Sequence, residues 1–205
     1  NLAAVAAFCI VVASPALVSS SCATPKTEQE DTTIIREDSG ITALKYSSPE
    51  VPASIEFCGK TIDLSRFDRH ERMDRELLAF TYMHSTSLQM LKKANRYFPI
   101  VEPILKENGI PDDFKYLMVI ESNMNPTARS SAGAAGLWQF MQGTGRDYGL
   151  EVNNNVDERY HIEKATRAAC RYLKDAYAKY KDWVAVAASY NAGQARIASQ
   201  LAKQD

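Results

Sequence analysis

Large apolar residues recur at steps of three and four from Arg69 onward, and this spacing constrains the fold more than any other feature of the chain. In the first part of the segment the recurring residues are Met73, Leu77, Phe80, Met83 or His84, Leu88 and Leu91. Residues at this spacing share one face of a helix. We therefore predict one long amphipathic helix from Arg69 to about Pro99, and a short second helix over residues 100–107 that ends at Gly109.

The rest of the chain predicts short helices separated by polar joints. Pro111, Asp112 and Asp113 are placed to start a helix that contains Glu121, and Asn125-Pro126 stops it. Further helices are expected over residues 137–148, 162–180, 183–190 and 193–203. No strand-like alternation follows residue 70, although a short strand or an irregular segment is possible over residues 55–64. Because the helices differ in length, we expect a mainly α, irregularly packed fold and not a regular bundle.

The N-terminal segment differs in composition from the rest of the chain. Residues 2–18 carry no charge and are mostly Ala, Val, Leu and Ile, which is typical of a signal-peptide core and short for a membrane span. Small residues then lead to Cys22, as in a bacterial lipoprotein signal whose cysteine is lipidated, although Ser19 stands where such signals prefer Leu. A plain secretory signal is the alternative. The polar, Thr-, Ser- and acid-rich residues that follow indicate a solvated tether.

Composition and charge exclude several classes of function. The chain is 45% apolar and 24% charged with a net charge of −1, which suits a globular protein and provides no field for nucleic acid. Cys58 and Cys170 are left for the exported protein, and sequence does not say whether they form a disulfide. The histidines, His70, His84 and His161, lack the spacing of metal ligands. We expect no metal and no cofactor.

Glu121 is a carboxylate on the apolar side of a predicted helix. Counting back by three, four and seven residues gives Met118, Leu117 and Phe114, which share its face. A carboxyl placed there is partly removed from water, which raises its pKa, and a general acid that works near neutral pH needs a raised pKa. The alternative is a glutamate at a helix end that turns to water.

Three motifs accompany Glu121. They are Glu121-Ser122 with Asn125-Pro126; Ser-Ser-Ala-Gly-Ala-Ala-Gly-Leu-Trp-Gln-Phe-Met over residues 130–141; and Ala-Ala-Ser-Tyr-Asn-Ala-Gly over residues 187–193. In order and spacing they resemble the lytic transglycosylases of glycoside hydrolase family 23, relatives of goose-type lysozyme, and most closely the membrane-bound lytic transglycosylase D branch. The resemblance covers about residues 95–200 and implies a lysozyme-like helical catalytic domain. Ser131 departs from the proline common at its place in that branch.

The resemblance implies a reaction with a single catalytic carboxylate, Glu121. Glycosidases normally need two carboxyl groups, but the motifs match only one. In the family, the C6 hydroxyl of N-acetylmuramic acid (MurNAc) attacks its own C1, so that a 1,6-anhydro sugar forms without water. Glu121 would act first as acid and then as base. The sequence offers Asp157 and Glu158 as a second carboxylate, but we interpret them as a helix cap and an acidic first turn.

The same resemblance implies a set of substrate-binding residues, each with a structural alternative. Ser122 is either beside the glutamate for hydrogen bonding or a polar residue at a helix end. Gly136 either leaves room for the sugar or turns the chain. Trp138 either lines the cleft or belongs to the core. Tyr190 either tunes the catalytic carboxyl or satisfies its own hydroxyl inside the fold. The full set is Ser122, Gly136, Leu137, Trp138, Gln139, Tyr190 and Asn191.

We therefore divide the chain into a signal peptide of lipoprotein type (1–22), a low-order tether (23–68), leading helices (69–110) and a lysozyme-like transglycosylase domain (111–205), expected to be incomplete at its C-terminus. The expected protein is an exported, monomeric peptidoglycan-cleaving enzyme of the periplasm, held on the outer membrane through Cys22, with no nucleic-acid partner. Two alternatives stay open: a lysozyme-like hydrolase and a non-catalytic murein-binding lipoprotein.

Overall fold

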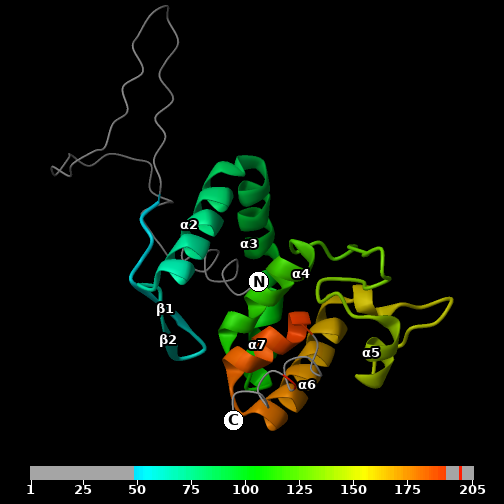
Figure 1. Ribbon diagram of the computed structural model, residues 1–205. Coiled ribbons are helices and arrows are strands. Elements are labelled where there is room, and N and C mark those ends of the chain that lie inside the picture. The colour runs from blue at the N-terminus through cyan, green and yellow to red at the C-terminus, as the bar shows by residue number, and fades with distance from the viewer. Residues whose placement is uncertain (1–48, 193–198, 200–205) are drawn as a thin grey trace, which may run out of the picture.

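The computed structural model describes residues 49–192 and 199, without the side chains of residues 191 and 192. The elements are β1 (Ser54–Phe57), β2 (Lys60–Asp63), α2 (Phe67–Tyr82), α3 (His84–Glu107), the 3-10 helix η2 (Asp112–Phe114), α4 (Lys115–Ser122), α5 (Gln142–Asp147), the 3-10 helix η3 (Glu158–Tyr160), α6 (Ile162–Tyr180) and α7 (Trp183–Ala192). The expected mainly helical fold is confirmed (Figure 1). The expected signal peptide, the lipidation site at Cys22 and, apart from residue 199, the helix expected over residues 193–203 lie outside the described residues.

Two strands, β1 and β2, lie inside the segment that the sequence predicted as a tether over residues 23–68. β1 and β2 form an antiparallel hairpin, with Phe57 opposite Lys60. Its two turn residues, Cys58 and Gly59, have φ of 51° and 75°, as the tightest hairpin turns require. Phe57 is buried, and the backbone N–H of Cys58 donates to Asp113 at 2.6 Å. The hairpin is therefore packed on the helical domain, which sequence composition does not reveal.

The first long helix breaks at Met83 and not at Pro99. Met83 has φ −81° and ψ 49°, and the Ser87 hydroxyl donates to the Phe80 carbonyl that the break leaves open. α3 instead continues through Pro99 and Pro103 to Glu107, so residues 100–107 are not a separate helix. Each proline removes one helical hydrogen bond, but the flanking residues are buried in the core and hold the helix. Chain reversal at Met83 makes α2 and α3 a helical hairpin (Figure 1).

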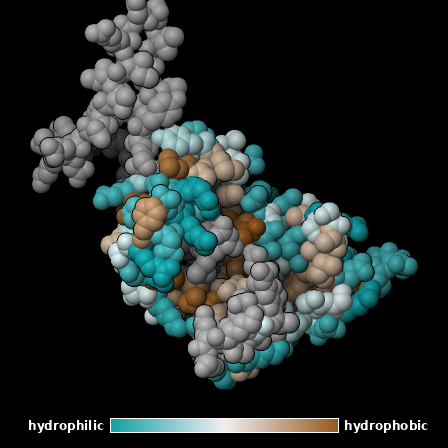
Figure 2. Space-filling model, in the orientation of Figure 1, coloured by the Kyte–Doolittle hydropathy of each residue, from teal (hydrophilic) through white to brown (hydrophobic). Residues whose placement is uncertain are grey.

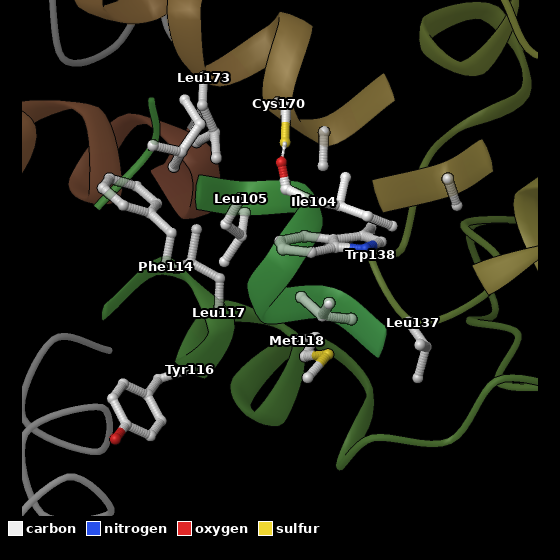
Figure 3. Packing of buried hydrophobic residues seen from close by; sticks show 14 of the residues in the cluster. Ile104, Leu105, Phe114, Tyr116, Leu117, Met118, Leu137, Trp138, Cys170 and Leu173 are labelled. Atoms are coloured by element: carbon white, nitrogen blue, oxygen red, sulfur yellow. Dashed lines mark hydrogen bonds between the residues drawn. The ribbon is translucent and has the colours of Figure 1, made fainter. Parts of the chain in front are cut away.

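The core lies between α3, α4, α6 and α7. Figure 3 shows Ile104 and Leu105 of α3 facing Leu117 and Met118 of α4, with Leu173 of α6 above them. α6 occupies residues 162–180, as the sequence predicts, and turns a face of small residues to the interior: Ala165, Ala168, Ala169, Cys170 and Ala176. Small side chains let two helices approach closely, which accounts for the close packing of α6 on α3. Cys58 and Cys170 do not form a disulfide with each other.

The predicted helix over residues 137–148 is wrong in its first half. Only residues 142–147 are helical, as α5, and the segment before it is a looped turn closed by bridges from Ala135 to Arg129 and Phe140. Gly136 has φ 78° and Gln139 has φ 48°, and a right-handed helix cannot accommodate either conformation. We call residues 128–140 the glycine loop. In the described part of the chain, no helix is long and apolar enough to cross a membrane.

Candidate active site around Glu121

Glu121 lies in the last turn of α4, on the face that the sequence predicted to be apolar. Phe114, Leu117 and Met118 are all buried, with exposed fractions of 0%, 3% and 0%. Glu121 itself is half-buried, and burial raises the pKa of its carboxyl. The predicted direction of the pKa shift is thus confirmed. The catalytic role of Glu121 stays a prediction.

α4 ends immediately after the Glu121-Ser122 pair, before the stop predicted at Asn125-Pro126. Asn123 and Met124 both take left-handed backbone conformations, with φ of 49° and 51°. The Met124 N–H donates back to the Met118 carbonyl at 3.3 Å, as in a Schellman ending. Met124 is fully buried and anchors this reversal. The reversal carries the chain directly into the glycine loop.

Ser122 connects the end of α4 to the glycine loop. Its hydroxyl lies 2.9 Å from the Met118 carbonyl and 2.9 Å from the Leu137 carbonyl. One hydroxyl carries one proton, so the two acceptors share it. The bond to Met118 fits the alternative of a polar residue at a helix end, and the bond to Leu137 in addition ties the glycine loop to α4.

Gly136 is needed for backbone packing rather than for sugar space. A Cβ at this position would lie 1.9 Å from the backbone oxygen of Arg159, in η3, and φ is 78°. Gly133, in the same loop, has φ 89° but no atom within 4 Å of its hypothetical Cβ. The expectation that Gly136 leaves room for the sugar is therefore corrected, because backbone atoms of η3 occupy that space.

Gly136→Ala is expected to destabilise the protein by about 2–4 kcal/mol, from left-handed strain plus overpacking. Gly133→Ala is the matched control: it brings the same kind of strain without the collision, and should cost about 1–2 kcal/mol. Urea denaturation followed by circular dichroism measures both. Equal losses for the two variants would show that contact with Arg159 does not limit this position.

Leu137 and Trp138 point into the core, so their side chains are not substrate contacts. Leu137 is 1% exposed and Trp138 is 0% exposed, and Figure 3 shows Trp138 beside Ile104 of α3. The Trp138 indole N–H donates to the Thr166 hydroxyl of α6 at 3.0 Å. A buried indole needs such a partner. The cleft-lining interpretation of Trp138 is corrected to a core role; only its backbone reaches the site.

Gln139 is held in a left-handed turn by its own side chain. Its amide nitrogen donates to the Gly136 carbonyl at 2.8 Å and to the Ala128 carbonyl at 3.3 Å. Both amide protons are therefore used inside the glycine loop. The side-chain oxygen, an acceptor with two lone pairs, is the part of Gln139 suited to a hydroxyl or acetamido N–H of a sugar.

Tyr190 of α7 joins the third motif to the other two. Its hydroxyl donates to the Trp138 carbonyl at 2.7 Å. Burial raises the pKa of Tyr190 well above its usual value, and the Glu121 carboxylate adds to the shift, so the two side chains lie within electrostatic reach. The Tyr190 ring packs edge-on against Tyr172 of α6 at 5.2 Å. Asn191 lies in the last turn of α7, and its side chain is outside the described atoms.

A buried arginine supports the loop, and the sequence analysis did not find it. Arg159 is 2% exposed and donates to the carbonyls of Gly133 and Phe140 at 2.8 and 2.9 Å. Asp157 binds its guanidinium through both carboxylate oxygens, at 2.9 and 2.7 Å. The Asp-x-Arg pattern in the sequence was the available signal, but it is too common to identify a buried pair.

Asp157 and Glu158 do the structural work that the sequence predicted. Asp157 caps η3 by accepting from the Arg159 N–H, and Glu158 lies in its first turn and pairs with Lys164. Hydrogen bonds from Arg159 lower the pKa of Asp157, and the bond from Lys164 lowers the pKa of Glu158. Basic partners hold both carboxylates in their ionised forms, whereas burial raises the pKa of Glu121.

The three motifs therefore meet at the backbone of residues 137 and 138: Ser122 bonds one carbonyl and Tyr190 the other. The sequence model described as "Transglycosylase SLT domain" matches residues 99–205, which contain all three. The chain belongs to this family. The predicted family and its mainly helical, lysozyme-like fold are confirmed.

Two relatives show how the match is distributed. The chain is 31% identical over 128 residues to the "Membrane-bound lytic murein transglycosylase D" of Escherichia coli K12, an alignment that covers 62% of this chain and 27% of that protein. It is 33% identical over 93 residues to the "Peptidoglycan transglycosylase gp16" of Escherichia phage T7, covering 44% of this chain and 7% of the phage protein. The chain thus matches only a minor part of the length of either relative.

Proposed function

We propose that this SLT-family protein is a murein lytic transglycosylase that cleaves the β-1,4 bond between MurNAc and N-acetylglucosamine (GlcNAc). The observation that supports the proposal is the half-buried carboxyl of Glu121, whose pKa is raised by burial, at the point where three motifs meet. Family membership and the names of the two relatives support the same chemistry.

In the first step Glu121, protonated, gives its proton to the glycosidic oxygen as the bond from that oxygen to C1 of MurNAc breaks. GlcNAc leaves with a free O4 hydroxyl, and positive charge develops at C1, where the 2-acetamido group of MurNAc can stabilise it. A raised pKa keeps Glu121 in the acid form that this step needs.

In the second step the Glu121 carboxylate accepts the proton of the MurNAc C6 hydroxyl while O6 forms a bond to C1. The product is a 1,6-anhydromuramoyl end, and Glu121 is protonated again for the next cycle. No water is consumed and no second carboxyl group is required. Gln139 and Asn191 are the polar residues proposed to bind sugar groups, with Ser122, Gly136 and Tyr190 supporting the site through the backbone.

The ion pairs of Asp157 and Glu158, the two candidates for a second carboxylate, support this route over hydrolysis. A hydrolase needs a second carboxylate to activate water or to act as nucleophile. Asp157 is paired with the buried Arg159, and Glu158 with Lys164. Neither carboxylate is therefore suited to activate a water molecule beside Glu121.

Product analysis distinguishes the two reactions. Purified murein digested with the protein is expected to yield muropeptides with 1,6-anhydro ends, each lighter by one water than the hydrolysis product, in mass spectrometry. Reducing-end products that carry the added water would contradict the proposal and favour the lysozyme-like alternative. An absence of any cleavage by the intact protein would favour the non-catalytic murein-binding alternative.

We also propose export to the periplasm with a lipid anchor at Cys22, on the strength of the uncharged residues 2–18 before it. Metabolic labelling with a radioactive fatty acid is expected to mark the wild type and not Cys22→Ala. Equal labelling of both would contradict the anchor, and no labelling of either would favour a plain secretory signal.

A further inference from the structure

The tip of the α2–α3 hairpin exposes several large apolar side chains. Tyr82, Met83 and Leu88 are 38%, 51% and 59% exposed. They surround the chain reversal at Met83, and the Tyr82 ring lies edge-on to His84 at 6.1 Å. Figure 2 shows hydrophobic surface at this end of the molecule. The other exposed large apolar residues, Phe67, Met141 and Val156, are scattered singly.

The segment that contains this tip is depleted of charge. Residues 77–91 contain no Asp, Glu, Lys or Arg, whereas charged residues are dense on either side, in the first part of α2 and at Lys92, Lys93 and Arg96 of α3. The polar residues exposed between the apolar ones are His84, Ser85 and Gln89. An ordinary solvated helix face carries charges, so their absence over both arms of the tip needs a reason.

The tip is not required by the core. Met73 and Leu77 of α2 form a separate small cluster with Leu64 below the tip. The reversal itself is held by the Ser87 hydroxyl on the Phe80 carbonyl. Neither the cluster nor this hydrogen bond includes Tyr82, Met83 or Leu88, which stay exposed.

We propose that this tip inserts into the interfacial layer of a phospholipid membrane. Tyrosine, methionine and leucine bury apolar surface there while the tyrosine hydroxyl stays hydrated, and charged side chains would be costly at that depth. Three side chains are too few for a stable dimer, which buries about 800 Å² on each partner. The uncharged residues 2–18 of the same chain also suit a protein held at a membrane. The proposal is independent of the proposed reaction.

Depth-dependent quenching tests the insertion. The full chain carrying Tyr82→Trp is bound to vesicles of phosphatidylethanolamine and phosphatidylglycerol, with or without lipids brominated on their acyl chains. The matched control is Phe67→Trp, an equally conservative change at an exposed site about 22 Å away along α2. The wild-type protein gives the background fluorescence of Trp138 and Trp183.

Brominated lipid is expected to quench the added emission of Tyr82→Trp by at least about half, and that of Phe67→Trp only slightly. Adding Met83→Ser and Leu88→Ser should remove most of the quenching at position 82. No quenching at position 82, or equal quenching at positions 82 and 67, would overturn the proposal. A change in Tyr82→Trp emission with protein concentration in the absence of vesicles would also overturn it, because a second copy would then cover the tip.

Discussion

Glu121→Gln is expected to slow murein cleavage by about a thousandfold or more. The amide keeps the shape of the side chain but can neither give a proton to the glycosidic oxygen nor accept the C6 hydroxyl proton, and positioned acid–base groups contribute about 10²–10⁴-fold to rate. Clearing of a murein suspension measures the loss. Glu71→Gln, on the exposed surface of α2, is the matched control and should leave the rate unchanged. Full clearing by Glu121→Gln would refute the role assigned to Glu121.

The same variant, although slower, is expected to be more stable than wild type at high pH. Because burial raises the pKa of Glu121 in the folded state, the folded protein holds its proton to higher pH than the unfolded chain does. The free energy of unfolding should therefore fall as pH rises from the ordinary glutamate pKa through the raised one. Glu121→Gln lacks this loss, so above that window it should be more stable than wild type.

Denaturant titrations over a pH series measure the difference. The rate of murein cleavage by wild type should also decline as pH rises past the raised pKa, since the acid form carries the first step. A variant that is inactive and also less stable at every pH would indicate a folding defect instead of a lost proton donor.

Arg159→Met is expected to destabilise the protein by about 3–5 kcal/mol. It removes a buried guanidinium that pairs with Asp157 and satisfies two backbone carbonyls of the glycine loop. Both carbonyls would lose a buried donor and the partly exposed Asp157 would lose its guanidinium, and breaking a pair that involves a buried charge costs about this much. Chemical denaturation provides the measurement.

Two further variants make the Arg159 prediction specific. Arg167→Met breaks the exposed pair with Glu107, at 3.1 Å, and should cost less than about 1 kcal/mol. The double variant Asp157→Asn with Arg159→Met should lose less than the sum of the two single changes, because it leaves no unpaired buried charge. Additive losses would show that the Asp157 pair does not stabilise the loop as proposed.

Regular periodicity predicted the helices best. α6 has the predicted bounds, 162–180, and α7 begins at Trp183 as predicted. The apolar face beside Glu121 follows from counting along one helix, which requires no knowledge of the partners. These features depend on residues within one or two helical turns of each other, so sequence spacing was sufficient.

The errors arose where distant parts of the chain decide local structure. Proline at 99 predicted a helix end, but burial along α3 holds the helix through it, and the reversal falls at Met83, which carries no sequence signal. Residues 137–140 of the glycine loop were predicted as the start of a helix, but contacts with η3 and left-handed residues in the loop exclude a helix there. The sequence left Trp138 as either a cleft or a core residue, and its bond to Thr166 of α6 decides for the core.

By itself the sequence determined a mainly helical domain, the SLT motifs and the apolar helical face that carries Glu121, because helical spacing and short motifs act over a few residues. Only the tertiary structure decided what surrounds that acid. It showed that Ser122 and Tyr190 converge on the carbonyls of Leu137 and Trp138, that Gly136 makes room for η3, and that Arg159 supports the loop. These contacts join residues far apart along the chain, and their hydrogen bonds exist only once the core has brought them together.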